Sequence, residues 1–266
     1  MNNIKHYVLI RFYCIDMIER EQLFNDDFLN KGFEIFRKYT LKSLENQTNK
    51  NFEIIILIHD EIDDNISSIQ KFKVLNSTIK INVIRFNELR KFMLDNIKGF
   101  EYLITTRMDH DDIIYNKAVE EIQNKCNKNI PFYYNGYDRL ITMINNDYEN
   151  CYKFYPNYNG DGAINIFQSV ILNLKYTKEI KYNIFSLSHT KGKPQLISWY
   201  NDNNYEFKDE YFNINHIEDS CIYIKHEFNH STYQHELLNT KWHRTNIKVD
   251  KPKEWFIERF GNFIDN

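Results

Sequence analysis

Cysteine is scarce in this chain, and its spacing excludes two kinds of stabilised small domain. The 266 residues contain four cysteines, Cys14, Cys126, Cys151 and Cys221, and no two of them form a Cys-x-x-Cys pair. Such wide spacing indicates neither a disulfide framework nor a thiolate zinc site. The pattern is typical of a protein from a reducing compartment.

The chain also lacks a long apolar run. No stretch approaches the ~18 consecutive apolar residues that a transmembrane helix needs. The apolar run at 7–13 is interrupted by Arg11, is too short for the apolar region of a signal peptide, and lacks a small-residue cleavage site. We therefore expect a soluble, cytoplasmic protein, and this expectation leaves open a peripheral contact with the inner face of the membrane.

Neither sign of charge dominates. The 34 basic and 37 acidic residues give a formal net charge of −3, which does not favour a nucleic-acid partner. An aromatic content of 16% and a hydrophobic content of 42% exclude a disordered chain. Alanine occurs only at Ala118 and Ala163, whereas Asn, Lys, Ile, Tyr and Phe are abundant throughout. We attribute this bias to an AT-rich genome rather than to function.

The first 112 residues alternate between strand and helix patterns. The near-continuous apolar run at 52–58 is typical of a strand covered on both faces, and apolar residues recur at helical spacing from Phe28 to Leu44. Strands are expected at 7–13, 52–58, 79–86 and 101–105, and helices at 28–44, 66–74 and 89–97. This alternation predicts an α/β fold with a mixed, mostly parallel sheet flanked by helices. Ligands of such sheets bind beyond the carboxyl ends of the strands.

The remaining residues follow a less regular pattern. They predict a helix at 117–125, paired strands at 131–135 and 138–144 around Gly136, a buried segment at 164–174, a loop-like stretch at 187–210, a strand at 220–226 and an amphipathic helix at 253–264. No internal repeat and no linker marks a boundary. We therefore expect a single domain over 1–266, with halves at 1–112 and 113–266.

Three carboxylates follow the fourth predicted strand within four residues. They are Asp109, Asp111 and Asp112. Carboxylates packed this closely raise one another's pKa unless a cation lies among them, and oxygen ligands favour Mg²⁺ or Mn²⁺. The alternative is a helix N-terminus, which accounts for Asp111 or Asp112 but leaves Asp109 and Arg107 unexplained. We therefore predict a divalent metal site at the three aspartates, suited to transfer chemistry on a phosphorylated or nucleotide-activated substrate.

The string Thr105-Thr-Arg-Met-Asp-His-Asp-Asp112 resembles the threonine-arginine-leucine-aspartate-rich motif of the putative rhamnosyltransferase family. That family is similar to family-2-type glycosyltransferases with the A-type nucleotide-sugar fold. Further matches occur in the same order: His6 with Arg11-Phe12, Ser43-Leu44 and Gln47-Thr48 before Asn51-Phe52, Asn135-Gly136, His189, and Ile224-Lys-His226 with Asn229. Two departures are that His110 stands where the family usually has another acid and that 186–216 match poorly.

The resemblance implies roles for the acidic residues. Asp60, which follows the second strand, would contact the base or ribose of the nucleotide, with a turn-forming aspartate as the alternative. Asp109 and either Asp111 or Asp112 would hold the divalent ion and a ribose hydroxyl. The ion would neutralise the charge on the leaving nucleoside diphosphate.

The resemblance also implies roles for basic residues. Arg107 would add a bidentate phosphate contact, and the alternative is an ion pair with a neighbouring aspartate. Arg11 would contribute in the same way. His226 and Asn229 would contact the diphosphate or the acceptor, and the alternative is a satisfied structural cluster.

A sugar transfer that inverts configuration needs a general base for the acceptor hydroxyl. Glu218-Asp219 resembles the pair that supplies the base in family-2 enzymes, so Asp219 is the first candidate, with a merely solvated carboxylate as the alternative. His189 and Asp161 are further candidates. The implied activity is metal-dependent transfer of a sugar from a nucleoside-diphosphate donor to a hydroxyl of a surface glycan or lipid-linked acceptor. Rhamnose as donor sugar is implied by the resemblance alone. In this interpretation 1–112 bind the nucleotide and 113–266 shape the acceptor side.

Two other functional classes compete with this interpretation. His226-Glu227-Phe-Asn-His230 matches the H-E-x-x-H motif of zinc metalloproteases. However, the motif follows a strand-like run, Ser231-Thr232 would break its helix, and no familiar third-ligand spacing is present. The second class is a non-catalytic module that binds a nucleotide or a glycan without turnover.

The C-terminal tail carries an aromatic stripe beside several cations. The aromatic residues are Trp255, Phe256, Phe260 and Phe263, and the cations are Lys241, Arg244, Lys248, Lys251 and Lys253. Such a helix packs on the core in most proteins. The alternative is binding to an anionic membrane surface that carries a lipid-linked acceptor.

Overall fold

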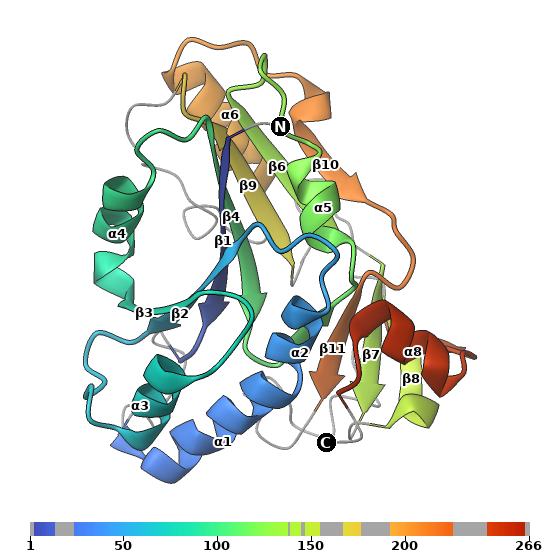
Figure 1. The fold of residues 1–266 in the computed structure, drawn as a ribbon. Coiled ribbons are helices and arrows are strands. Elements are labelled where there is room, and N and C mark those ends of the chain that lie inside the picture. The colour runs from blue at the N-terminus through green and yellow to red at the C-terminus, as the bar shows by residue number, and fades with distance from the viewer. Residues whose placement is uncertain are drawn as a thin grey trace.

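The computed structural model describes residues 3–13, 24–137, 139–144, 147–154, 167–176, 192–225 and 244–263. These residues form two β-sheets with helices around them (Figure 1). The first sheet has the strand order β10-β6-β9-β4-β1-β2-β3. Its strands are β1 (Ile4–Arg11), β2 (Glu53–Ile58), β3 (Ile81–Arg85), β4 (Tyr102–Asp109), β6 (Phe132–Tyr137), β9 (Gln168–Asn173) and β10 (Phe212–Asn215).

The second sheet is smaller and follows the end of β4. Its order is β12-β8-β7-β11-β5, with β5 (Asp112–Ile114), β7 (Leu140–Ile144), β8 (Cys151–Phe154), β11 (Cys221–Lys225) and β12 (Arg244–Lys248). In the first sheet β3, β2, β1 and β4 are parallel, β9 is antiparallel to both of its neighbours, and β10 is parallel to β6. The expected α/β class with a mixed, mostly parallel sheet is therefore confirmed.

Helices flank both faces of the first sheet. They are α1 (Asp26–Lys38), α2 (Thr40–Glu45), α3 (Ser67–Val74), α4 (Leu89–Asn96), α5 (Ala118–Gln123), α6 (Gly192–Asp202) and α8 (Lys253–Phe260). Phe92 of α4 packs on Tyr7, whereas Gln123 of α5 contacts His6, and these neighbouring residues of β1 point to opposite faces. Single 3₁₀ turns occupy Phe86–Glu88, Tyr148–Asn150 and Asp209–Tyr211.

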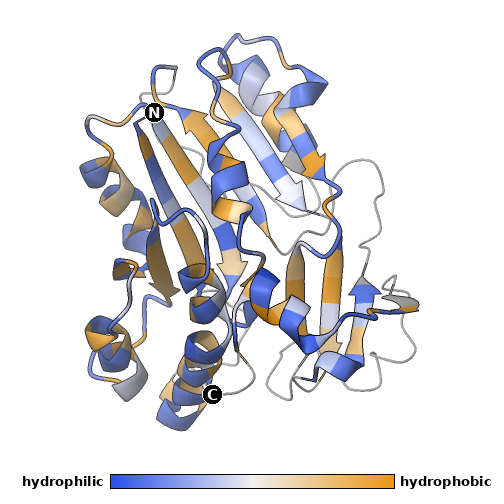
Figure 2. Cartoon of the chain, turned by 45° about the vertical axis from the view of Figure 1, so that its right-hand side comes forward, coloured by the Kyte–Doolittle hydropathy of each residue, from blue (hydrophilic) through white to orange (hydrophobic). Residues whose placement is uncertain are grey.

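The hydrophobic core follows the strands. All apolar residues of β2 are buried, as expected for a strand covered on both faces. Figure 2 shows the hydrophobic colour concentrated on the strands, while the loops and the outer sides of the helices are mostly hydrophilic.

The expected helix at 28–44 is instead a pair of helices. The chain leaves regular helix at Tyr39, between α1 and α2. Apolar residues keep their helical spacing across this break, so the prediction from periodicity joined the two helices into one.

Two further predictions were wrong. The strands expected to pair around Gly136 lie in different sheets, because β6 already has β9 and β10 on its two sides and no edge is left for β7. The stretch at 187–210 was predicted as a loop, but its described part contains α6. Leu196, Trp199 and Tyr200 are buried there at helical spacing, and the many polar residues around them concealed this short pattern.

The two halves of the chain, 1–112 and 113–266, do not correspond to the two sheets. Strands β6, β9 and β10 come from the second half of the chain and complete the first sheet. Both halves therefore build the sheet edge at which β4 ends.

The C-terminal helix α8 packs on the protein interior beside the second sheet (Figure 1). Phe256, Phe260 and Phe263 are buried, as the packing interpretation of the aromatic stripe predicted. Arg259 donates hydrogen bonds to the backbone carbonyls of Glu218 and Asp219, both at 2.8 Å. Within the described ranges no helix is both long and apolar enough to span a bilayer.

Candidate functional site

The carboxyl ends of β1 and β4 meet at an arginine–aspartate pair. Arg11 and Asp109 occupy matching positions in these two parallel strands. The Arg11 Nε donates to Asp109 Oδ1 at 2.5 Å, and its Nη2 donates to Oδ2. Burial alone would raise the pKa of Asp109, but the charges of Arg11 and Arg107 hold that pKa below its ordinary value. Asp109 is therefore an ionised carboxylate whose two oxygens both accept from Arg11.

The turn that follows holds two more buried carboxylates. We call residues 109–112 the acid turn. Asp111 and Asp112 are 6% and 2% exposed. The backbone N–H of Asp109 donates to Asp112 Oδ2 at 3.3 Å, whereas no described residue donates to Asp112 Oδ1. Burial and then the charges of Asp111 and Asp109 raise the pKa of Asp112 well above its ordinary value. Keeping Asp112 ionised in this position costs free energy, and a group that neutralises or ligates its carboxylate would offset that cost.

The remaining residue of the acid turn, His110, has a packing role. Its ring lies edge-on to Phe12 at 5.5 Å and to Tyr13 at 4.8 Å between ring centroids. These aromatic residues directly follow β1. The ring thus joins the ends of β1 and β4 at the position where the family usually has an acid.

Helix α2 holds the acid turn through side-chain hydroxyls. Thr40 Oγ1 donates to the Asp112 carbonyl at 2.8 Å, and Ser43 Oγ accepts from the Ile114 N–H at 3.3 Å. Both hydroxyls are buried. Thr40 is not among the residues predicted from the sequence, although a threonine followed three residues later by a serine at the start of a helix places both hydroxyls on one face.

Gln47, just beyond α2, continues this contact along the chain. Its Nε2 donates to the Tyr115 carbonyl at 2.8 Å, and its Oε1 accepts from the Val119 N–H at 3.1 Å. The Ser43 and Gln47 positions that carry the family resemblance therefore satisfy buried backbone groups of the segment that follows β4. Their role is to position the acid turn.

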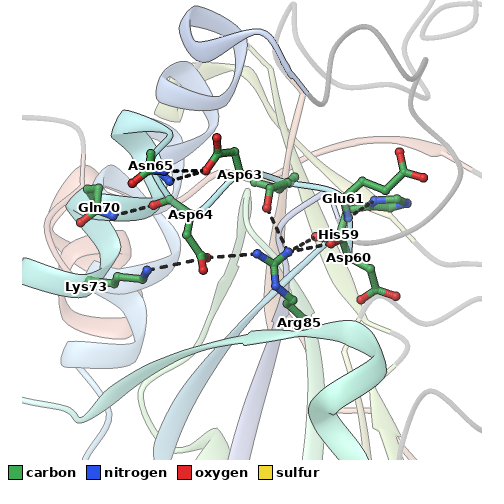
Figure 3. Close-up of polar contacts among 10 residues, drawn as sticks. His59, Asp60, Glu61, Asp63, Asp64, Asn65, Gln70, Lys73 and Arg85 are labelled. Carbon is green, nitrogen blue, oxygen red and sulfur yellow. Dashed lines mark hydrogen bonds and ion pairs between the residues drawn. The ribbon is translucent and has the colours of Figure 1, made fainter.

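Asp60 lies at the same sheet edge, in the loop after β2. Its side chain is exposed, and its Oδ1 accepts from the Asn87 N–H at 3.1 Å. Figure 3 shows Arg85 at the centre of this loop, where its Nη1 donates to the carbonyls of Asp60 at 2.7 Å and Ile62 at 2.9 Å. Its Nη2 also pairs with Asp64 at 3.3 Å. The loop is therefore built around a cation that links β2 to β3.

The structure separates Asp219 from the acid turn. Asp219 precedes β11, in which Tyr223 pairs with Asp112. Asp219 and Tyr223 are four positions apart, which corresponds to about 13 Å of extended chain. The Asp219 carboxylate is buried and pairs with Lys153 at 3.3 Å. The role of Asp219 as general base stays a prediction from the sequence.

The other predicted site residues lie outside the described ranges. They are His189, Asp161, His226 with Asn229, and the remainder of the H-E-x-x-H string, Glu227 and His230.

Arg107 is buried on the same face of β4 as Asp109. It is 5% exposed, and its register partner on β9 is Gln168, which is fully buried. Gln168 is not among the residues predicted from the sequence. The available signal was a glutamine just before the apolar run Val170-Ile-Leu172.

The donor atoms of the acid turn fit a hard divalent cation only in part. Among the described residues no group of three or more His, Cys, Asp or Glu side chains is arranged to hold a metal ion. Asp109 is engaged by Arg11, which leaves Asp111 and Asp112. Two carboxylates, with the other positions left to water and substrate phosphate, are a common way to bind Mg²⁺. The unpartnered Oδ1 of Asp112 fits this arrangement.

One family model matches most of this chain. The family model described as “Putative rhamnosyl transferase” matches residues 16–191, about two thirds of the chain, and this range includes Asp60 and the acid turn. No curated protein matches.

Several solved structures are similar at low identity. One is a “putative nucleotide-diphospho-sugar transferase” from Desulfovibrio desulfuricans G20, with 10% identity, a TM-score of 0.41, and coverage of 82% of this chain and 81% of that one. A second is S. aureus TarS 1–349 in complex with UDP, with 16% identity, a TM-score of 0.35, and coverage of 83% and 60%. A third is a cytidylyltransferase from Leptospira borgpetersenii serovar Hardjo-bovis (strain JB197), with 14% identity, a TM-score of 0.39, and coverage of 83% and 78%.

Proposed function

Because the chain belongs to the family described as “Putative rhamnosyl transferase”, we propose that it transfers a sugar from a nucleoside-diphosphate donor to a hydroxyl group of a glycan or lipid-linked acceptor. The family makes the protein a transferase. The donor nucleotide, the metal dependence and rhamnose as the transferred sugar are parts of the proposal, as are a role in polysaccharide biosynthesis and a cytoplasmic location at the inner face of the membrane.

One observation supports this proposal above the others. The acid turn places Asp111 and Asp112 in a buried position where parallel strands end, and Asp112 Oδ1 accepts no hydrogen bond from the described residues. Three carboxylates lie there, and among the described residues the charges of Arg11 and Arg107 act on Asp109. A divalent cation would balance the excess of negative charge and would stabilise the ionised form of Asp112.

The proposed roles follow from the contacts. Asp111 and Asp112 would hold Mg²⁺ or Mn²⁺, which supplies positive charge to the diphosphate of the leaving group. Arg11 fixes the carboxylate of Asp109 in place. Arg107 adds positive charge beside the diphosphate.

The nucleoside would lie toward β2. Asp60 follows that strand at the same edge of the sheet, with one carboxylate oxygen bound to the Asn87 N–H. The second oxygen would accept from the ribose or the base. Asp219, His189 and Asp161 remain the candidate general bases from the sequence.

The proposal is tested by thermal shift with UDP, dTDP, GDP and CDP, each with and without Mn²⁺. A nucleoside diphosphate at about 100 times its Kd would stabilise the wild type by about 2.7 kcal/mol, which raises Tm by several degrees. Asp112→Asn should lose the part of the shift that requires Mn²⁺. Asp95→Asn, at an exposed position in α4, should keep it.

Three outcomes decide between the functional classes. A shift that requires Mn²⁺, together with release of nucleoside diphosphate from a sugar nucleotide, supports the transferase. A shift without any turnover of sugar nucleotides in the presence of glycan acceptors supports a non-catalytic binding module. No shift with any of the four nucleotides contradicts the proposal.

A further inference from the structure

Gln168 is the first residue of β9, and its amide has unused hydrogen-bonding capacity. The side chain is fully buried, and neither its Nε2 nor its Oε1 has a hydrogen-bond partner in the part of the chain that the structure describes. Among the described residues it is the one buried side chain with two unpartnered polar atoms. Buried amides are nearly always satisfied, because removing both atoms from water without replacement costs folding free energy. An amide kept in this state is suited to bind a partner other than the described residues, such as a ligand.

The neighbours of Gln168 place it beside the proposed donor site. In the register of the first sheet Gln168 lies between Arg107 on β4 and Gly136 on β6. These three residues share one face, because directly opposite residues in antiparallel strands point the same way. Asp109 and Arg11 lie on this face as well, one step further along β4 and on β1. Gly136 itself contributes no side chain on the β6 side of Gln168.

The strand order indicates which part of a donor would reach Gln168. Strand β9 adjoins β4 on one side, while β1 and then β2 follow on the other. Adjacent strands are about 4.8 Å apart. If the diphosphate lies at the acid turn and the nucleoside lies toward Asp60 after β2, the group on the opposite side of the diphosphate is the transferred sugar.

We infer that the Gln168 amide binds hydroxyl groups of the donor sugar and contributes to the choice of sugar. An amide offers one acceptor and two donor hydrogens in a single plane, and a pair of neighbouring hydroxyls can both accept from it and donate to it. A site built to bind a hydroxyl strongly rejects an analogue that lacks it, since buried polar groups are then left unpaired. This inference rests on the proposed function and adds a residue to it.

The test compares wild type with Gln168→Met, which keeps the length of the side chain and removes its polar atoms. Kd values are measured by titration calorimetry with Mn²⁺ for UDP and dTDP and for their rhamnose and glucose conjugates. The readout is the ratio of the Kd of the free nucleotide to the Kd of its best sugar conjugate. We expect this ratio to fall about 10-fold in Gln168→Met, as the loss of one to two hydrogen bonds predicts, while the Kd of the free nucleotide stays within about twofold.

Asn173→Leu is the matched control on the same strand. Asn173 is also a buried amide, but its Nδ2 donates to the Lys128 carbonyl at 3.2 Å and its Oδ1 accepts from the Lys175 N–H at 3.1 Å. Asn173→Leu should lower Tm and leave the ratio unchanged. Gln168→Met should keep Tm or raise it, because it removes an unsatisfied amide.

Each remaining outcome has one meaning. An unchanged ratio in Gln168→Met overturns the inference, and so does an equal loss of affinity for the free nucleotide and its conjugate. A lower Tm in Gln168→Met with an unchanged ratio identifies a structural amide satisfied by water. Failure of the wild type to bind any nucleoside diphosphate refutes the proposed function itself, and with it the inference.

Discussion

Asp112 is the residue at which folding and the proposed chemistry conflict most. Its carboxylate is buried, lies beside two other acids, and accepts one long hydrogen bond from the Asp109 N–H. Its pKa is raised by burial and by the charges of Asp111 and Asp109. A raised pKa in the folded state means that the ionised side chain destabilises the fold. Residues that break the rules of stable packing in this way are often functional.

The first prediction concerns the stability of Asp112→Asn without divalent ions. The variant should have a Tm higher than wild type by about 2–4 °C at pH 7.5, the effect of about 1 kcal/mol in a protein of this size. The difference in Tm between the variant and wild type should narrow as the pH falls toward 5. Protonation of Asp112 stabilises the folded protein. This stabilisation is fully present below the ordinary carboxyl pKa and is lost as the pH rises through the raised pKa of Asp112 in the folded state. Differential scanning fluorimetry in EDTA measures both. A variant less stable than wild type at pH 7.5 would contradict this account of the site.

His6 forms a buried hydrogen-bonded chain across the first sheet. Its Nδ1 lies 3.3 Å from Gln123 Nε2 and its Nε2 lies 2.8 Å from Thr106 Oγ1. An amide nitrogen only donates, so Nδ1 accepts and Nε2–H donates to Thr106, which in turn lies 2.8 Å from Ser169 Oγ. Burial lowers the pKa of His6 from 6.5 to about 3. The neutral ring is therefore a structural element of β1.

The second prediction follows from the lowered pKa of His6. Its contribution to stability is fully present above the unfolded pKa of 6.5 and is lost as pH falls toward about 3. The loss is about 1.4 kcal/mol per pH unit. The stability advantage of wild type over His6→Gln should therefore shrink by about 2 kcal/mol between pH 6.5 and pH 5. Urea unfolding of both proteins at the two pH values tests this, and a constant difference would rule it out.

Helix α2 is a short element whose polar side chains define its role. Thr40 and Ser43 bond the backbone around β5, and Gln47 continues the series beyond the helix end. The sequence shows these residues as part of a recognisable motif, but not their purpose. Their partners lie about 70 positions away in the chain, with a separation of 72 residues for the Thr40 contact and 68 for the Gln47–Tyr115 contact.

The third prediction is that Gln47→Leu destabilises the protein by about 2–4 kcal/mol, because the Tyr115 carbonyl and the Val119 N–H lose their partner in a buried region. It should also weaken nucleotide binding that depends on Mn²⁺, since the acid turn is connected to this segment. Urea unfolding and thermal shift measure the two effects.

Gln70→Leu is the control for that variant. The Gln70 amide also donates to a backbone carbonyl, that of Asp64 at 2.5 Å, but the residue is exposed. A change below about 1 kcal/mol is expected there. Equal losses in the two variants would show that α2 does not have the role assigned to it.

The whole molecule depends on contacts between the two sheets. The chain passes directly from β4 in the first sheet to β5 in the second, and later strands return to complete the first. Helix α8 and the residues just after it close this arrangement. The ring centroids of Phe263 and Tyr39 are 6.1 Å apart, and the Arg259 carbonyl accepts from the Asn116 N–H at 2.8 Å. The C-terminal segment thus contacts the junction of α1 and α2 and the segment that follows β5.

The fourth prediction is that Phe260→Ala costs about 3–5 kcal/mol, as expected for a fully buried aromatic side chain. Unfolding should remain a single transition when it is followed by far-UV circular dichroism and by tryptophan fluorescence. Phe86→Ala, at a side chain that is 38% exposed, should cost much less. Two separate transitions in Phe260→Ala would show that the sheets fold independently.

Local features of this protein could be predicted from its sequence. A pattern that repeats over two to four residues is visible in a single sequence. Such patterns were enough to predict the strands β1 to β4, the helices between them and the acids after Thr106. The family resemblance added the position of the acid turn within a nucleotide-sugar fold. These predictions succeeded because burial of one face imposes a period on neighbouring residues.

Only the tertiary structure decided which of these elements meet. It paired Arg11 with Asp109 across 98 residues, placed Asp219 at the far end of β5, put β6 and β7 in different sheets, and brought Gln168 beside Arg107. Each of these outcomes depends on strand order and register. Both are determined by the simultaneous packing of distant segments, which no local spacing records.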